Sequence, residues 1–140
     1  MEITFTQDRD NRHAYLNGYV DEVLRVNAYR YDRHGELVPF SPRRERLSLR
    51  AAAALVREAE SFRRAQYAHL AAAVERLQPR SVGNVWAEMG ACFALSSSGH
   101  GAGFFDTGGL GELADTLQAA ARVYGGQEVV LNDDGLLDVL

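Results

Sequence analysis

The chain has 140 residues, of which 46% are hydrophobic, and its formal net charge is −4. This length supports one hydrophobic core and predicts a single domain over residues 1–140. A lone cysteine, Cys92, excludes an intrachain disulfide and the usual cysteine-based zinc sites, and it fits a reducing compartment. Charges interrupt every apolar-rich stretch, and Glu2 and Asp8 stand where a secretory signal needs positive charge, so a cytoplasmic protein without a membrane partner is expected.

Charge is segregated along the chain. Residues 25–80 contain 12 arginines and six acidic residues, whereas residues 81–140 contain one arginine and eight acidic residues. All 15 basic residues are arginine, a bias that a GC-rich genome produces without selection for anion binding. The two halves can neutralise each other within the fold, which is the favoured interpretation, or present separate charged faces to partners.

The N-terminal third is predicted to contain a strand, a helix and a hairpin. Residues 1–6 alternate between apolar and polar, which is typical of a short half-buried strand. Residues 13–26 carry apolar side chains at helical spacing, so a helix is expected there. Residues 28–38 contain a turn-like cluster ending in Gly35 and predict a hairpin or an extended loop, after which Pro39 and Pro42 interrupt regular structure.

The clearest helix signal begins at Ser48, a residue type favoured at helix N-caps. Alanine-rich, amphipathic sequence continues from there to Leu77, and Pro79 ends it. A break into two helices near Ser61 or Tyr67 is left open.

The C-terminal third is predicted as a strand–turn–strand–helix–strand unit over residues 90–140. Residues 85–90 predict a helical turn or a loop, and residues 91–97 predict a strand. Glycines at every second position of the following run leave one face of an extended chain bare; they are Gly99, Gly101 and Gly103. An amphipathic helix over residues 110–124 and a hairpin with an Asp-Gly turn complete the unit. The predicted class is α+β, with a small antiparallel sheet packed by a long central helix and a C-terminal amphipathic helix.

The glycine run and its histidine are candidates for chemistry. The run lacks both the Gly-x-Gly-x-x-Gly pattern that opens a helix and the Lys-Ser/Thr of a phosphate loop, so a structural turn is favoured over nucleotide binding. His100 and Asp106, with a nucleophile from Cys92 or residues 96–98, supply the residue types of a hydrolase, but within too short a window for easy convergence. The four histidines show no metal-binding spacing, and no metal or cofactor is expected.

Arginines of the central region are the candidates for a binding surface: Arg43, Arg44, Arg46, Arg57, Arg63 and Arg64. They suit an acidic protein surface or a nucleic acid, and Tyr29 and Tyr31 have side chains that stack on bases. The negative total charge makes direct nucleic-acid binding the less favoured of these options.

Residues 93–106 read FALSSSGHGAGFFD, and LGEL follows at residues 110–113. Over residues 90–135 the chain resembles a group of small uncharacterised proteins of tailed bacteriophages and prophages, whose hallmark reads roughly FWLTRNGHGAGFWDRG followed by LGELGD. The chain departs from that pattern at Ala94, where the group favours Trp, and at residues 97 and 98, where it favours Arg-Asn. The resemblance implies a phage origin and no particular activity.

Together these features predict a non-enzymatic phage-type accessory protein that binds a host protein or a protein–nucleic-acid complex. Inhibition of a bacterial defence system such as CRISPR is one concrete form of that function. The binding groups would be the arginines named above, or the acidic C-terminal unit with His100 and Asp106. The alternatives are a small-ligand binder or hydrolase centred on the Gly-His-Gly turn, and a component of the virion or its assembly.

Overall fold

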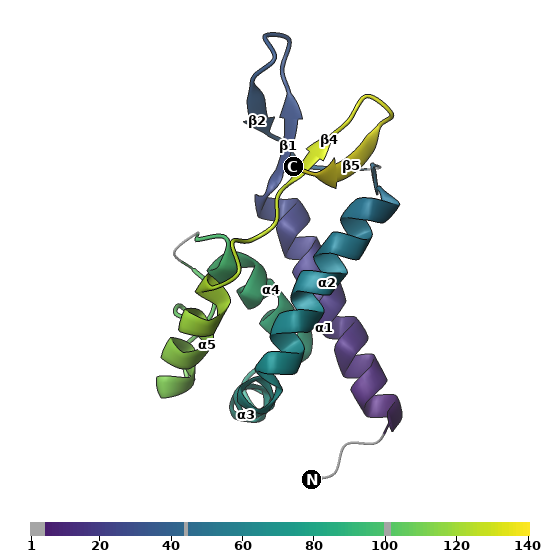
Figure 1. Ribbon diagram of the computed structural model, residues 1–140. Coiled ribbons are helices and arrows are strands. Elements are labelled where there is room, and N and C mark those ends of the chain that lie inside the picture. Colours follow the sequence, from purple (N-terminus) through teal and green to yellow (C-terminus); the bar gives the residue numbers. More distant parts are fainter. Residues whose placement is uncertain (1–4, 44, 100–101) are drawn as a thin grey trace.

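A helical layer carries a small sheet at one end (Figure 1). The computed structural model describes residues 5–43, 45–99 and 102–140. Over these ranges the elements are α1 (Phe5–Val26), β1 (Ala28–Tyr31), β2 (Leu37–Pro39), β3 (Arg46–Leu47), α2 (Leu49–Ala65), α3 (Tyr67–Leu77), α4 (Val85–Ser97), α5 (Glu112–Arg122), β4 (Val129–Leu131) and β5 (Leu136–Val139). This element set confirms the predicted α+β class.

Helices α1 and α4 cross in close contact because each has a glycine at the crossing. A Cβ atom added to Gly18 would lie 2.1 Å from the backbone oxygen of Ala87, and one added to Gly90 would lie 2.0 Å from that of Tyr15. No other residue type leaves room for two backbones to approach this closely.

The predicted N-terminal strand is wrong for residues 5 and 6, which begin α1, and residues 1–4 lie outside the described ranges. A period-two alternation over only six residues is a weak signal for a strand. Residues 5 and 6 instead continue into a helix of 22 residues, and an ion pair between Asp8 and Arg63 holds the first turns of this helix against α2.

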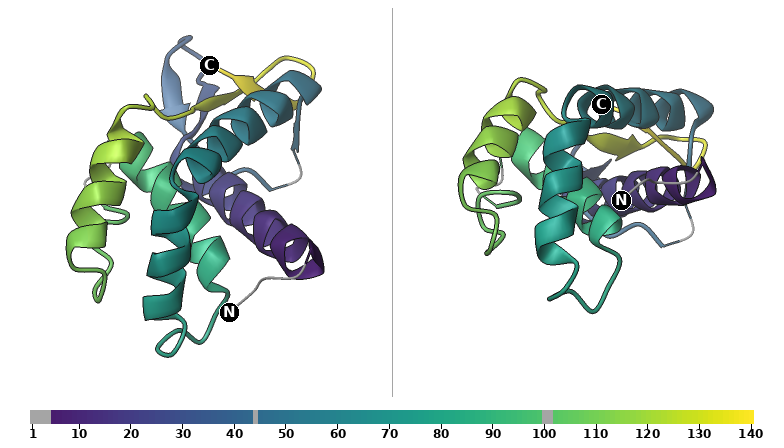
Figure 2. Two further views of the ribbon diagram at one scale, coloured as in Figure 1. Left: turned by 60° about the horizontal axis from the view of Figure 1, so that its bottom comes forward. Right: turned by 90° about the horizontal axis from the view of Figure 1, so that it is seen from below.

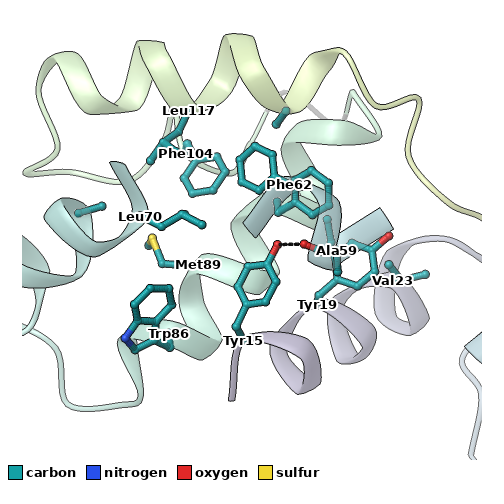
Figure 3. Close-up of a cluster of buried hydrophobic side chains, with 14 of the residues drawn as sticks. Tyr15, Tyr19, Val23, Ala59, Phe62, Leu70, Trp86, Met89, Phe104 and Leu117 are labelled. Carbon is teal, nitrogen blue, oxygen red and sulfur yellow. Dashed lines mark hydrogen bonds between the residues drawn. The ribbon is translucent and has the colours of Figure 1, made fainter. Parts of the chain in front are cut away.

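Aromatic side chains from several helices stack at the centre of the core (Figure 3). The ring centroids of Phe62 and Phe93 lie 4.2 Å apart, and Phe104 stacks on Phe62 at 5.9 Å. Tyr124 meets Phe62 and Phe93 edge-on. These contacts hold α2, α4 and the segment after α5 around one core, as expected for a single domain.

The predicted central helix starts as expected and breaks once. Ser48 is the N-cap of α2, with its Oγ accepting a hydrogen bond from the backbone N–H of Ala51 at 3.0 Å. Gln66, with φ −113°, separates α2 from α3, directly before Tyr67, one of the two positions where a break was left open.

The predicted strand at residues 91–97 is wrong, because these residues form the second half of α4. Asn84 caps this helix by accepting from the N–H of Ala87 at 3.1 Å. Side chains are buried on several sides of α4, and an apolar run of this kind lacks the helical periodicity that would separate it from a buried strand. Residues 90–140 therefore form helix, loop, helix and hairpin.

The sheet has the strand order β2-β1-β4-β5-β3. It is mixed rather than antiparallel, because β1 pairs with β4 and β3 pairs with β5 in parallel. Strands β1 and β4 are far apart in sequence, and the helices between them bring β4 back alongside β1. Residues 28–38, predicted as a hairpin or an extended loop, and residues 129–140, predicted as a hairpin or a strand and tail, both contain hairpins.

One face of the sheet, here called the inner face, packs against the helical layer, with α2 lying on β5 and β3. It carries the buried side chains of Ala28, Val129 and Leu137. The opposite face, here called the outer face, carries Tyr29, Tyr31, Leu37, Pro39, Arg46, Val130, Leu136 and Asp138, as the strand registers require.

Candidate functional site

A shallow groove of about 720 Å³ lies where α1 meets α2. We call it the arginine groove; its lining residues are Arg12, Val56, Arg57, Glu60, Ser61, Arg64 and Ala65. It contains two of the arginines predicted from sequence, Arg57 and Arg64, and adds Arg12 from α1.

Glu60 forms the acidic floor of the groove and is 7% exposed. Arg12 donates from Nε to its Oε2 at 2.8 Å, and the Nε of Arg64 lies 3.9 Å from the same oxygen. The other oxygen, Oε1, is buried and accepts no hydrogen bond from the described residues; Nη1 of Arg63 lies 3.7 Å from it. Glu60 therefore orients arginines from both helices, and one of its oxygens retains accepting capacity.

Arg63 lies behind the groove and is 7% exposed. Its Nη2 donates to Oδ1 of Asp8 at 3.0 Å, and its guanidinium carbon lies 5.4 Å from the ring centroid of Tyr67. Its Nε is buried without a hydrogen-bond partner in the described part of the chain. The structure thus assigns this predicted binding residue to internal contacts that join the first turns of α1 to α2.

The other arginines of the groove face solvent. The side chain of Arg64 is 79% exposed and that of Arg12 is 39% exposed. Arg57 is exposed and forms no ion pair or hydrogen bond with the described residues. The groove therefore contains three guanidinium groups and one carboxylate, which leaves an excess of positive charge. A planar guanidinium group can pair with a carboxylate or a phosphate through two parallel hydrogen bonds. The groove is suited to an anionic group of a partner.

The groove favours binding over bond-breaking chemistry. No histidine or cysteine is among its lining residues as described. Its one hydroxyl, Ser61 Oγ, is hydrogen-bonded to the hydroxyl of Tyr124 at 3.0 Å. An arginine guanidinium stays protonated at any ordinary pH, so it does not serve as a general base.

The remaining predicted arginines lie elsewhere. Arg43 and Arg46 precede the N-terminus of α2, at the opposite end of that helix from the groove, and Arg44 lies outside the described residues. A helix of 17 residues is about 25 Å long, so the run of arginines in the sequence does not form one continuous face.

The Gly-His-Gly region gives the hydrolase alternative no support. Ser96 is 1% exposed; its Oγ donates to Oε1 of Gln118 at 2.7 Å and accepts from the N–H of Phe104 at 3.1 Å. Burial raises the pKa of the Cys92 thiol, although its hydrogen bond with Thr107 acts in the opposite direction. Ser97 and Ser98 both donate to the backbone oxygen of Ala94.

The two described glycines of the run, Gly99 and Gly103, do not lie in a strand. Gly103 has φ +106°, and a Cβ atom there would lie 2.3 Å from Ser96 Oγ, so the loop lies directly on α4. Gly99 ends α4 with φ +74°, and no atom lies within 4 Å of where its Cβ would be. Asp106 is exposed in the loop after Gly103, while His100 and Gly101 lie outside the described residues.

A second hollow, of about 500 Å³, lies between the start of α1, α3 and the start of α4. Trp86 contributes to its wall and stacks on Tyr67 with the ring centroids 5.8 Å apart. Amide side chains from three elements also line it, namely Gln7, Asn11, Gln78 and Asn84. This hollow lacks a concentration of charge, so the arginine groove is the better-defined site.

Two further sequence expectations concern metals and membranes. Among residues 5–43, 45–99 and 102–140, no group of three or more histidine, cysteine or acidic side chains is placed to hold a metal ion. In the same ranges, no helix combines the length and the apolar character needed to cross a membrane.

Sequence reasoning missed Arg12 and Glu60, the two residues that join the helices across the groove. A signal was present for each. Glu60 directly follows Ala59 in the apolar stripe of α2, and Arg12 precedes Tyr15 by three positions on α1, so both charges border the buried face. Charges at the edge of an apolar stripe indicate a contact between helices.

Comparison with known proteins adds no identification. No family model matches the chain, and searches of curated proteins and of solved structures found no match. The functional argument therefore depends on the residues and the geometry described above.

Proposed function

We propose that this protein is a non-enzymatic binding protein whose arginine groove holds an acidic face of another macromolecule. The observation that carries the proposal is the pairing of Arg12 and Arg64, from two helices, with one buried carboxylate, Glu60, in a groove that the exposed Arg57 also lines. The anchor keeps guanidinium groups of two helices in one place, which lowers the entropy that would be lost on binding.

A protein carboxylate surface is favoured over a nucleic-acid backbone. The groove holds three exposed or partly exposed arginines, whereas tight binding to nucleic acid commonly uses 6–10 phosphate contacts, about twice that number or more. The chain as a whole also has a net charge of −4, which opposes long-range attraction to a polyanion. The partner is therefore proposed to be a host protein or the protein part of a nucleoprotein complex.

The resemblance of residues 90–135 to tailed-phage and prophage proteins supports a bacterial partner. Under that view the protein acts as a phage accessory factor, and blocking a defence complex such as a CRISPR effector is one concrete form of the activity. Groove binding would be electrostatic and would weaken with added salt.

Affinity capture from bacterial lysate tests the proposal. The bait proteins are the wild type, the groove variant Arg57→Gln/Arg64→Gln, and the control Arg80→Gln/Arg122→Gln, which removes the same charge from exposed arginines outside both surfaces. Mass spectrometry is expected to identify a partner that the wild type and the control retain and the groove variant loses. Capture of no specific partner, or equal capture by both variants, would contradict the proposal.

A further inference from the structure

The two hairpins of the sheet are built to the same design. In the first, the side chain of Asp32 accepts from the N–H groups of His34 and Glu36. In the second, the side chain of Asn132 accepts from the N–H groups of Asp134 and Leu136. The third residue after each of these side chains is a glycine, Gly35 or Gly135, with φ +77°. Residues 28–39 thus correspond one to one with residues 128–139.

Corresponding residues of the two hairpins lie on opposite faces of the sheet. In the parallel pairing of β1 with β4, Tyr29 lies beside Val130. The residue of the second hairpin that is equivalent to Tyr29, however, is Val129. A shift of one residue along a strand moves a side chain to the other face. The apolar side of the second hairpin therefore points to the inner face, and that of the first points to the outer face.

The two apolar sides differ in what covers them. In the second hairpin, α2 and the core cover Val129 and Leu137, which are both 0% exposed. Their counterparts in the first hairpin are more exposed: Tyr29 is half-buried and Leu37 is 39% exposed. Tyr31 is 56% exposed. Figure 1 and the left view of Figure 2 show the first hairpin extending beyond the ends of the helices.

We propose that the part of the outer face on the first hairpin, formed by Tyr29, Tyr31, Leu37 and Pro39, binds an amphipathic α-helix of a partner protein. The same hairpin design buries its other copy beneath α2, so a helix is the element that fits this surface. Exposed tyrosines at the centre of an apolar patch are typical anchors of protein interfaces. The inference is independent of the arginine groove, which lies on other elements.

The edge of this hairpin is not suited to accept a strand instead. The hydrogen bond from the N–H of Phe40 to the oxygen of Ala28 fixes which backbone groups of β2 point toward β1. By alternation, the outward-pointing groups belong to Leu37 and Pro39, and a proline has no N–H to donate. An added strand would find this short edge blocked, whereas a helix needs only the side chains of the face.

Charges near the face favour an acidic partner helix. Arg33, Arg43 and Arg46 are exposed in this region, whereas Arg30 alternates with the tyrosines and points to the inner face. Asp138, which also lies on the outer face, is held by Ser48 and Arg50. The carboxylates of Asp32 and Glu45 already accept from backbone N–H groups. Arg46 is exposed on the outer face and has no ion-pair partner among the described residues. The helix is therefore expected to carry acidic side chains beside its apolar stripe.

A second copy of this chain is a poor occupant. Across the described residues, α1 to α5 each bury an apolar stripe in the core of their own molecule, and Leu49 at the start of α2 is an isolated exposed apolar side chain. No helix with an unused apolar stripe is left to dock on the outer face of another copy. The occupant is therefore a helix of a different protein.

Three fluorescently labelled peptides test this inference by anisotropy: a helical peptide with a leucine stripe flanked by glutamates, the same peptide with lysines for glutamates, and the glutamate peptide broken by a central proline. The glutamate peptide is expected to bind saturably, and the other two at least about tenfold more weakly, since tenfold corresponds to the loss of one good contact. No saturable binding, or equal binding of the proline-broken peptide, would overturn the inference.

Variants locate the binding. Tyr31→Ser/Leu37→Ser replaces exposed side chains and should weaken the glutamate peptide at least about tenfold, a loss typical of interface anchors. Phe105→Ser/Val123→Ser removes more exposed apolar groups elsewhere and should leave binding unchanged. Both variants also carry Arg57→Gln/Arg64→Gln and are compared with that parent, so that the arginine groove does not bind the peptide. Loss of binding in the Phe105/Val123 control, or none in the Tyr31/Leu37 variant, would refute the site.

Discussion

Single residues in this protein divide between contacts that hold the fold and groups available to a partner. Arg63 and Arg64 are adjacent in sequence, yet the first is 8% exposed in its side chain and the second 79%. One helical step of 100° separates their directions and places one toward the core and the other toward solvent. Only the exposed one is available to bind.

Buried tyrosines make the fold sensitive to alkaline pH. Burial is the main cause that raises the pKa of both Tyr15 and Tyr19, and the nearby Glu58 carboxylate adds to it for Tyr19. The folded state therefore favours the neutral phenol. Their contribution to stability is complete below the unfolded pKa of about 10 and is lost as the pH rises above it.

Urea denaturation between about pH 9 and pH 11 should accordingly give a falling free energy of unfolding. Tyr19→Phe is expected to reduce that slope, and Tyr31→Phe, at an exposed position, is expected to leave it as in the wild type. A flat profile in the wild type would count against the burial of these phenols.

At the scale of elements, the crossing of α1 over α4 depends on glycine. A methyl group on Gly90 would lie 2.0 Å from Tyr15 O and 2.7 Å from Tyr19 N, and both are backbone atoms that cannot move independently of their helix. Gly90→Ala is expected to lower the free energy of unfolding by about 3 kcal/mol through overpacking. Chemical denaturation measures the change.

Gly108→Ala is the matched control, because no atom lies within 4 Å of the position of its Cβ. Its effect should stay within about 0.5 kcal/mol, as for most surface substitutions. Equal losses in the two variants would mean that the α1–α4 approach is looser than described.

Elements with a one-sided pattern were predictable, and those buried on several sides were not. The stripe of α5 and the N-cap of α2 follow from spacing and residue type in the sequence. Helix α4 lacks a polar face, so its sequence also fits a buried strand. The parallel pairing of β1 with β4 joins segments far apart in the chain, and no local pattern encodes it.

For the whole molecule, the sequence correctly predicted the α+β class. It did not anticipate the groove, because Arg12 and Glu60 meet only when α1 packs on α2. The paired turns at Asp32 and Asn132 were visible as similar strings, but their placement on opposite faces depends on the register of β1 with β4.

The two proposed binding surfaces are separate: the arginine groove between α1 and α2, and the outer face of the first hairpin. They lie on different elements, so variants at one need not disturb the other. A protein of this size could hold a single partner at both surfaces, in which case the combined binding would exceed that of either alone.

Arginine side-chain NMR tests the groove most directly, by following the Nε–Hε signals of the wild type during titration with a glutamate-rich peptide. The account predicts saturable shifts of Arg57 and Arg64 that disappear at high salt, while Arg80 and Arg122 stay unchanged. Equal small shifts of all exposed arginines, without saturation, would show only general attraction between charges and would contradict a binding site in the groove.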